Sequence, residues 1–320
     1  MFFPVANIEV NPLIPSAVAF IISFFTSMGG ISGAFLILPF QVSVLGFSAP
    51  AVSATNQLFN IVAIPSGVYR YIREDRMVWP LTTVVIIGTL PGVFIGAILR
   101  IKYLPDPKNF KLFVGLVLLY IGGRLIKDIL IKKRKGENQL SAEEQFQKQT
   151  REYRKTQPEG TEPGRNKMQG TVVKKFGLKR IVYEFYGQTF EVNTAGIMAL
   201  CFIVGIIGGV YGIGGGAIIA PFFVTFFGLP VYTVAGATLM GTFVTSIAGV
   251  TFYQMMAPLY PGMAIAPDWA LGFLFGLGGF AGMYCGARMQ KFIPARIIKT
   301  ILVICILIPA IKYILAYLLL

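Results

Sequence analysis

The feature that most restricts the fold of this chain is a glycine cluster between two long apolar runs. The stretch from Gly208 to Phe222 reads GGVYGIGGGAIIAPF, and residues 197–207 and 217–227 on either side of the cluster are apolar. Each glycine in a helix interior costs about 1 kcal/mol relative to alanine, so this cluster breaks a helix and bares backbone N–H groups. In lipid, bare N–H groups are tolerated only where they are buried in protein or line a wet cavity. The cluster therefore predicts a broken helix inside a membrane protein.

The composition favours the same class of protein. The 320 residues are 55% hydrophobic and 13% charged, whereas a soluble domain carries about 25% charged residues. The net charge is +14, but the basic residues gather in a few loops, which is typical of an oriented membrane protein rather than of nucleic acid binding. The chain has no histidine, which excludes imidazole metal sites and histidine acid–base catalysis. We expect no metal, no cofactor and no enzymatic activity.

An internal repeat organises the apolar sequence into two blocks. After a shift of 182 positions, residues 30–71 align with 212–253 without a gap, and about thirteen of the forty-two positions are identical. A membrane span needs about 20 residues, so the two short segments beside each glycine cluster are either tilted spans or halves of a re-entrant hairpin. Each block has five apolar segments: 13–28, 33–46, 51–69, 78–99 and 110–130 in the first, and 195–210, 213–228, 232–256, 268–287 and 295–318 in the second.

The loop charges give an orientation. Arg70, Arg73 and the basic run 132–135 are placed in the cytoplasm by the positive-inside rule, and loop 257–267, which has no basic residue, is placed outside. These assignments agree only if the second block is inverted. We therefore predict an all-α integral membrane protein of two inverted-topology repeats with 8–10 membrane helices, with both termini outside. Four basic residues conflict with this topology because it places them outside: Arg100, Lys102, Lys108 and Lys111.

Three regions follow from the pattern: transmembrane repeat 1 in 1–130, a basic cytoplasmic insert in 131–193, and transmembrane repeat 2 in 194–320. Within the insert, a capping box at Ser141 predicts a charged helix to about Lys155. The alternating residues around Gly187 predict a β-hairpin. The alternative is a solvated, weakly ordered loop.

The polar residues inside the apolar segments are neutral. No Asp, Glu, Lys or Arg lies in these segments away from their ends, which excludes a carboxylate proton relay at the midplane. Asn56 and Asn60 are four residues apart and share a helix face, and the repeat carries them to Thr238 and Thr242, on a face that Thr245 and Ser246 continue. Hydrogen bonding between helices is the alternative reading of these residues. The candidate anion-binding residues are Gly30, Gly33, Asn56, Asn60, Gly212, Gly214, Gly215, Gly216, Thr238 and Thr242.

Two stretches of the second block resemble a known family of membrane proteins. The stretch Tyr211–Pro221, YGIGGGAIIAP, resembles the glycine-rich signature of the sulfite exporter TauE/SafE family of membrane permeases, and Val234–Gly249 resembles the segment that follows it. The first copies, 29–39 and 52–67, match more loosely, because Ser32 and Ala34 interrupt the glycines. The resemblance implies a transporter of small sulfur-containing anions, such as sulfite or organosulfonates, in the cytoplasmic membrane. It implies export in some members and uptake in others.

The resulting hypothesis is a permease that works by alternating access. One repeat rocks against the other around an anion site at the midplane, where the N-termini of broken helices point at the substrate. The partners that this hypothesis requires are the small anion and membrane lipid, not nucleic acid. Two alternatives remain open: an anion channel on the same scaffold, and a membrane sensor or scaffold that acts through the insert.

Overall fold

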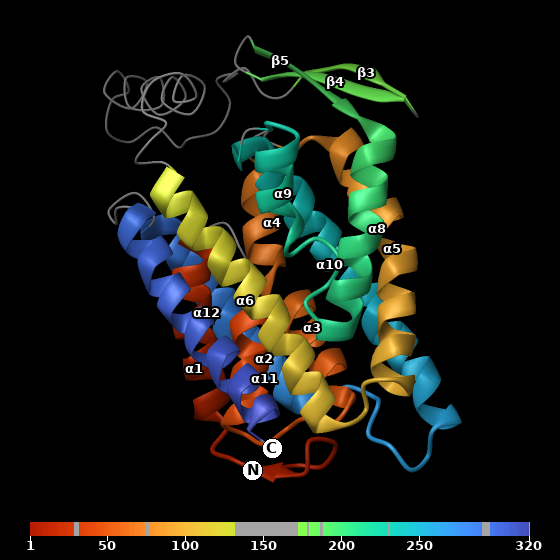
Figure 1. The fold of residues 1–320 in the computed structure, drawn as a ribbon, viewed down its shortest axis with the longest axis vertical. Helices are drawn as coiled ribbons and strands as arrows, with labels where there is room; N and C mark the ends of the chain where they lie inside the picture. The colour runs from red at the N-terminus through yellow and green to blue at the C-terminus, as the bar shows by residue number, and fades with distance from the viewer. Residues whose placement is uncertain are drawn as a thin grey trace.

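The chain forms a bundle of helices with a small β-sheet at one end (Figure 1). A computed structural model describes residues 1–28, 32–73, 77–131, 172–177, 179–185, 188–229, 231–289 and 295–319. The first block contains β1 (Phe2–Phe3), β2 (Ile8–Glu9), α1 (Leu13–Met28), α2 (Ala34–Ser43), α3 (Ala51–Ala63), α4 (Pro65–Arg73), α5 (Trp79–Lys102) and α6 (Pro107–Ile131). The rest contains β3 (Val172–Phe176), β4 (Arg180–Phe185), β5 (Gln188–Asn193), α8 (Thr194–Tyr211), α9 (Ile219–Phe226), α10 (Val231–Met256), the 3₁₀ turn η1 (Ala257–Leu259), α11 (Trp269–Met289) and α12 (Ala295–Leu318).

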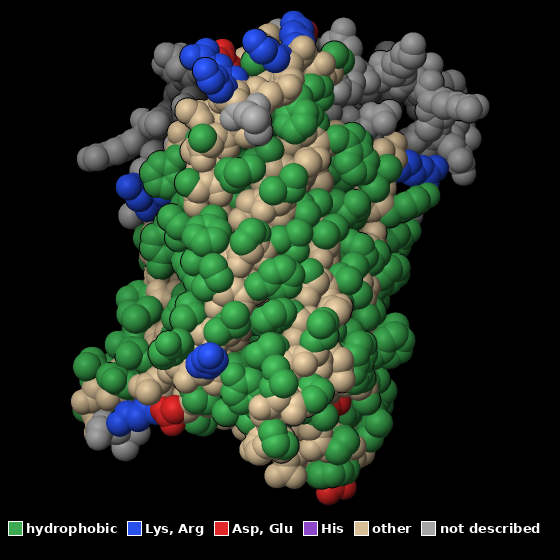
Figure 2. Space-filling view, turned by 90° about the vertical axis from the view of Figure 1, so that its right-hand side faces the viewer, with side chains coloured by type: hydrophobic (Ala, Val, Ile, Leu, Met, Phe, Trp, Pro, Cys, Tyr) green, Lys and Arg blue, Asp and Glu red, His purple; other side chains and the backbone are tan. Residues whose placement is uncertain are grey.

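Six of the described helices are long and apolar enough, by length and composition, to cross a membrane: α5, α6, α8, α10, α11 and α12. Figure 2 shows hydrophobic side chains over most of the height of one face, with Lys and Arg gathered at its upper end and further charges near its lower end. This distribution is that of a protein whose middle faces hydrocarbon and whose ends face water. The prediction of an all-α membrane fold is confirmed.

The short segments beside the second glycine cluster form a re-entrant hairpin. Helix α8 ends at Tyr211 and α9 begins at Ile219, so the chain leaves helical structure between them. At the other end of the hairpin, a Cβ placed on Gly196 would lie 3.6 Å from the Phe227 ring, so the start of α8 and the end of α9 lie side by side. The chain therefore enters and leaves at the same end of the bundle, which two tilted spans would also do. Helix α9, however, has only 8 residues, far fewer than the about 20 that a helical span needs, so this pair is a hairpin.

The third segment of the first block differs from the prediction of one continuous span. It is divided into α3 and α4 at Ile64, immediately before Pro65. Proline has no N–H and its ring clashes with the preceding turn, so it interrupts the helix. The repeat places Ile247 at the equivalent position of the second block, and there α10 runs unbroken from Val231 to Met256.

The two ends of the bundle differ in content (Figure 1). Both termini lie at one end, and the sheet of β3, β4 and β5 lies at the other. The first block starts at the end with the termini, whereas the second block starts at the sheet, because β5 continues directly into α8. Which end faces the cytoplasm stays a prediction from the loop charges.

The expected hairpin of the insert is present as β4 and β5, which pair antiparallel from Arg180 with Asn193 to Phe185 with Gln188. A third strand that the sequence did not predict, β3, pairs with β4. The Tyr183 hydroxyl lies 3.0 Å from the hydroxyl of Thr233 on α10 and ties the sheet to the bundle. Burial raises the pKa of Tyr183 to about 12. The charged helix expected at 141–155 lies outside the described residues.

Glycines bring helices of the two blocks into backbone contact. A Cβ on Gly96 of α5 would lie 2.2 Å from the Ile206 carbonyl oxygen of α8, and one on Gly92 would lie 2.4 Å from that of Phe202. The equivalent Gly286 and Gly282 of α11 meet the backbone of α1 in the same way. Small residues allow such close helix packing in membrane proteins, and here it locks each block onto the other.

Two charges near the end that carries the termini are buried in protein. Arg100, which the predicted topology places outside, is fully buried. It donates to the carbonyls of Leu104 and Ser48, and its guanidinium lies 3.7 Å from the Phe110 ring centroid. Asp268 is also buried and accepts hydrogen bonds from the N–H groups of Leu271 and Ala6. Buried charges need such partners. The bonds of Arg100 to Leu104 and Ser48 and of Asp268 to Ala6 thus hold the loops at this end of the bundle.

We predict that Gly96→Ala lowers the thermal stability of the detergent-purified protein. The added methyl group would meet backbone atoms of α8 that do not move independently, and overpacking of this kind costs about 1–3 kcal/mol. The matched control is Gly123→Ala on α6, where a Cβ meets nothing within 4 Å. A melting temperature unchanged by Gly96→Ala would contradict the close α5–α8 contact.

Candidate functional site

The second glycine cluster forms an irregular loop deep in the bundle. Gly212 caps the C-terminus of α8 in the left-handed region, with φ of 81°, and its N–H binds the Gly208 carbonyl at 2.8 Å. Gly214 is also left-handed, with φ of 75°. Residues with a side chain rarely adopt these angles, so the two glycines fix the point where the helix stops. The break predicted from the sequence is confirmed.

The loop is held by three neighbouring helices. A Cβ on Gly212 would lie 2.3 Å from the Ser53 carbonyl oxygen of α3, and one on Gly216 would lie 2.1 Å from the Thr238 carbonyl oxygen of α10. A Cβ on Gly215 would lie 2.3 Å from Thr89 Cβ of α5. The glycines are needed because the loop backbone touches all three helices.

The first glycine cluster is described only in part. Gly30 lies outside the described residues. Gly33 directly precedes α2 with an ordinary φ of −66°, and a Cβ there would lie 2.8 Å from Ser23 Oγ of α1. Its lack of a side chain therefore allows α1 and the start of α2 to approach each other.

Asn56 and Asn60 of α3 connect the two breaks. Asn56 Nδ2 donates to the Ala34 carbonyl at 2.9 Å and to the Gly212 carbonyl at 3.1 Å. Asn60 Nδ2 donates to the Ile213 carbonyl at 3.0 Å, while Asn60 Oδ1 accepts from Ser32 Oγ at 2.6 Å. Both side chains are fully buried. The shared face predicted from their spacing is confirmed, and each side chain bonds one residue at each break.

The threonines of the second block act differently. Thr238 Oγ1 donates to the Ala235 carbonyl at 3.2 Å, and Thr242 Oγ1 donates to the Thr238 carbonyl at 2.8 Å, so both hydroxyls bond within α10. They still face the loop, because a Cβ on Gly216 would lie 2.7 Å from Thr242 Oγ1. The contact from α10 to the loop backbone is made by Thr245, whose Oγ1 accepts from the Gly215 N–H at 2.9 Å.

Several contacts at the site were not among the candidates from sequence. Thr245 and Ser246 lie on the predicted polar face of α10, and Ser246 Oγ is 3.4 Å from Asn60 Nδ2. Ser32, which interrupts the glycines of the first copy, donates to Asn60 Oδ1. Gln41 of α2 donates to Asn56 Oδ1 at 3.4 Å. Its signal in the sequence was an amide inside an apolar helix.

The loop retains donor capacity. The Gly212 and Ile213 N–H groups bind the Gly208 carbonyl, and the Ile219 N–H binds the Gly216 carbonyl. No described acceptor has hydrogen-bonding geometry to the N–H groups of Gly214 and Gly216. Buried N–H groups are seldom left unpaired, so these two are candidate donors to a bound anion.

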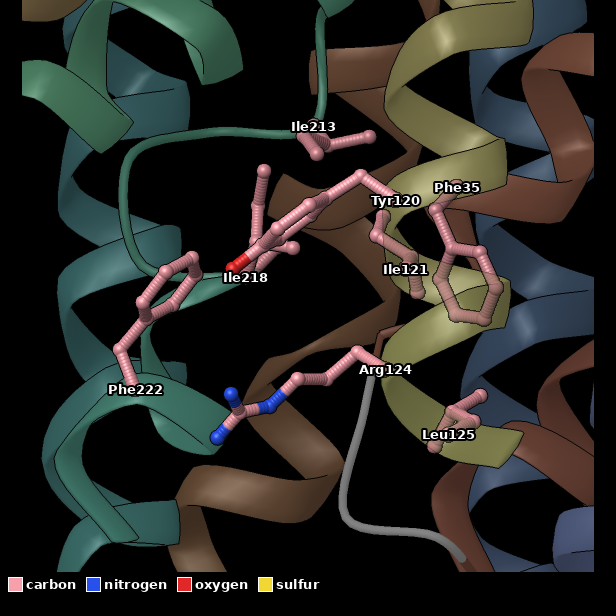
Figure 3. Close-up of a pocket in the computed structure, with 9 residues that line it drawn as sticks. Phe35, Tyr120, Ile121, Arg124, Leu125, Ile213, Ile218 and Phe222 are labelled. Carbon is pink, nitrogen blue, oxygen red and sulfur yellow. The ribbon is translucent and has the colours of Figure 1, made fainter. Parts of the chain in front are cut away.

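A small pocket with a mainly apolar lining lies beside this loop (Figure 3). Its wall includes Ile213 and Ile218 of the second break, Phe35 of α2, and Tyr120 and Arg124 of α6. Figure 3 shows Ile213 and Arg124 toward opposite ends of the labelled group, with Tyr120 between them. The pocket thus connects the neighbourhood of the break to a cation near the C-terminal end of α6.

The chain matches the model of a known protein family. The family model described as Sulfite exporter TauE/SafE matches residues 16–313, which includes both blocks and the insert. No curated protein and no solved structure matches the chain significantly.

We predict that Asn56→Leu and Asn60→Leu each lower the melting temperature of the purified protein. Each removes the donor to buried carbonyls at the breaks, and an unsatisfied buried polar group costs about 1–3 kcal/mol. The matched control is Thr251→Val on α10, whose hydroxyl is exposed and bonds only to the Ile247 carbonyl. An unaltered melting temperature for both asparagine variants would show that their amides do not hold the breaks.

Proposed function

The chain belongs to the sulfite exporter TauE/SafE family, and on that premise we propose that it carries small sulfur-containing anions, such as sulfite or organosulfonates, across the cytoplasmic membrane. The anion binds at the two helix breaks by hydrogen bonds and helix dipoles. The six long apolar helices support a multi-pass membrane location. The loop charges support placing the insert in the cytoplasm and both termini outside.

The observation that carries the proposal is the pair of breaks joined by Asn56 and Asn60. Two irregular backbone segments meet inside an apolar bundle, and amide and hydroxyl side chains surround them. Helix α9 begins after the second break and α2 after the first, and helix N-termini attract negative charge without a charged side chain. In a site of low dielectric constant, such donors bind an anion more strongly than they do in water.

Anion binding in this proposal exchanges one set of hydrogen bonds for another. In the described conformation, the Asn56 and Asn60 amides donate to backbone carbonyls. The spare N–H groups of Gly214 and Gly216 would receive the anion first. The amides, with the hydroxyls of Thr238 and Thr242, would then turn from carbonyl oxygens to anion oxygens.

Alternating access requires one part of the bundle to move relative to another. The glycine contacts join α5 to α8 and α1 to α11. Motions that keep these contacts carry helices of both blocks together, which differs from the rocking of one repeat against the other that the repeat pattern suggests. We propose that α5, α8, α9 and α10 form one moving body and that α1, α2, α6, α11 and α12 form the other. The pocket lies on this boundary, because α6 forms one of its walls and the second break forms the other.

Arg124 has a role in this scheme as an entrance charge. It lines the pocket near the end of α6 that leads into the insert, and its guanidinium lies 5.8 Å from the Phe226 ring centroid of α9. A cation at the mouth of an otherwise apolar pocket raises the local concentration of anions.

The test of the proposal is flux of labelled sulfite into proteoliposomes that contain the purified protein. We expect saturable uptake that unlabelled sulfonates inhibit, and we expect Thr242→Val to raise KM about tenfold, the equivalent of about 1.4 kcal/mol. Valine keeps the shape of threonine, so the fold is retained while the hydroxyl is lost. Thr251→Val is the control and should keep the wild-type KM.

Absence of saturable sulfur-anion flux in either direction would overturn the proposal. Single-channel currents in planar bilayers would replace it with the channel alternative. The sensor alternative is tested by deleting residues 136–170, which leaves β3, β4 and β5 in the chain. A transporter should keep its flux after this deletion. Loss of flux with an unchanged melting temperature would instead support the alternative in which the protein acts through the insert.

A further inference from the structure

Gln57 of α3 is a buried amide without a hydrogen bond. Its side chain is fully buried, and neither Nε2 nor Oε1 has a partner among the described residues. Each unsatisfied buried polar group costs about 1–3 kcal/mol, and such groups in a native protein call for an explanation. The adjacent Asn56 and Asn60 on the same helix do have partners.

The position of Gln57 places the amide near the second break. The amide lies against Gly249 of α10, where a Cβ would be 1.9 Å from Gln57 Oε1. One turn away on α3, Ser53 Oγ donates to the Val210 carbonyl at 2.9 Å. One turn away on α10, the Tyr253 hydroxyl donates to the Gly209 carbonyl at 3.1 Å. The amide is thus held between two helices that both contact the last turn of α8, where the second break begins.

The internal repeat supplies a control for packing. The shift of 182 carries Gln57 to Leu239 and Gly249 back to Gly67. The equivalent contact exists, because a Cβ on Gly67 would lie 3.6 Å from Leu239 Cδ1. The same side-chain-over-glycine contact between α3–α4 and α10 is therefore made twice. In one copy an apolar leucine fills the space over the glycine. Packing alone therefore does not explain why the other copy has an amide at this position.

We propose that Gln57 is a binding residue for the transported anion, with Nε2 donating to an oxyanion oxygen. This inference rests on the proposed function and adds a residue that the sequence candidates did not include. In the described conformation the amide donors of Asn56 and Asn60 bond to backbone carbonyls, and these bonds must break before the amides can bind an anion. The Nε2 group of Gln57 carries two N–H donors, and no existing hydrogen bond has to break before they bind an anion. Gln57 can bind the anion without losing a structural hydrogen bond. When no anion is bound, the missing side chain of Gly249 leaves room for the amide.

The decisive variant is Gln57→Leu, which copies the residue of the equivalent contact. We expect its melting temperature to equal or exceed that of the wild type, because it removes an unpaired buried amide and keeps the packing. We expect KM for sulfite to rise at least tenfold, and the thermal stabilisation that sulfite confers on the wild type to disappear at the same concentration. The matched control is Leu239→Met, which should leave the melting temperature and KM near wild type.

Two results would overturn the inference. A Gln57→Leu protein with wild-type KM and wild-type sulfite stabilisation would show that the amide does not meet the anion. A lower melting temperature with unchanged KM would show that the amide holds a structural water instead. In both cases wild-type flux persists and the proposed function stands. Absence of saturable flux in the wild type and in Leu239→Met would instead remove the function and this inference with it.

Discussion

The structure depends on one constraint: in hydrocarbon, every backbone polar group must be satisfied within the protein. A helix meets this constraint automatically, but a helix interrupted by glycines does not. The break after Tyr211 exposes carbonyls at Gly212 and Ile213, and Asn56 and Asn60 donate to them. The two amides thus do what the next turn of helix would have done. They also leave the irregular backbone in the centre of the bundle.

Close glycine packing sets how the two blocks fit together. The α5–α8 and α1–α11 interfaces bring backbone onto backbone, and each joins one helix from each block. The blocks that are separate in sequence are therefore interlocked in space. Any motion that opens the site has to respect these contacts, and this is why the proposed moving bodies contain helices of both blocks.

The repeat is symmetric in backbone and asymmetric in chemistry. Asn56 and Asn60 reach across to the other break, whereas Thr238 and Thr242 bond within their own helix. The two equivalent contacts onto a glycine differ in the same way, because the first block supplies the amide of Gln57 and the second supplies the apolar side chain of Leu239. The first block supplies amides and the second supplies the denser glycine loop. A single site between unequal halves fits this division better than two equivalent sites.

The sequence by itself determined the local features. The density of glycines determined the second break, and the periodic apolar runs determined the long helices. The four-residue spacing placed Asn56 and Asn60 on one helix face. The alternation of apolar and polar residues determined β4 and β5. These follow from propensity and periodicity, which are properties of neighbouring residues. Tertiary structure decided the rest: the carbonyls that the asparagines meet, the burial of Arg100, and the unpaired state of Gln57. The contacts of Asn56 with Gly212 and of Gln57 with Gly249 join segments more than 150 residues apart, because a hydrogen-bond partner is chosen by packing and not by sequence distance.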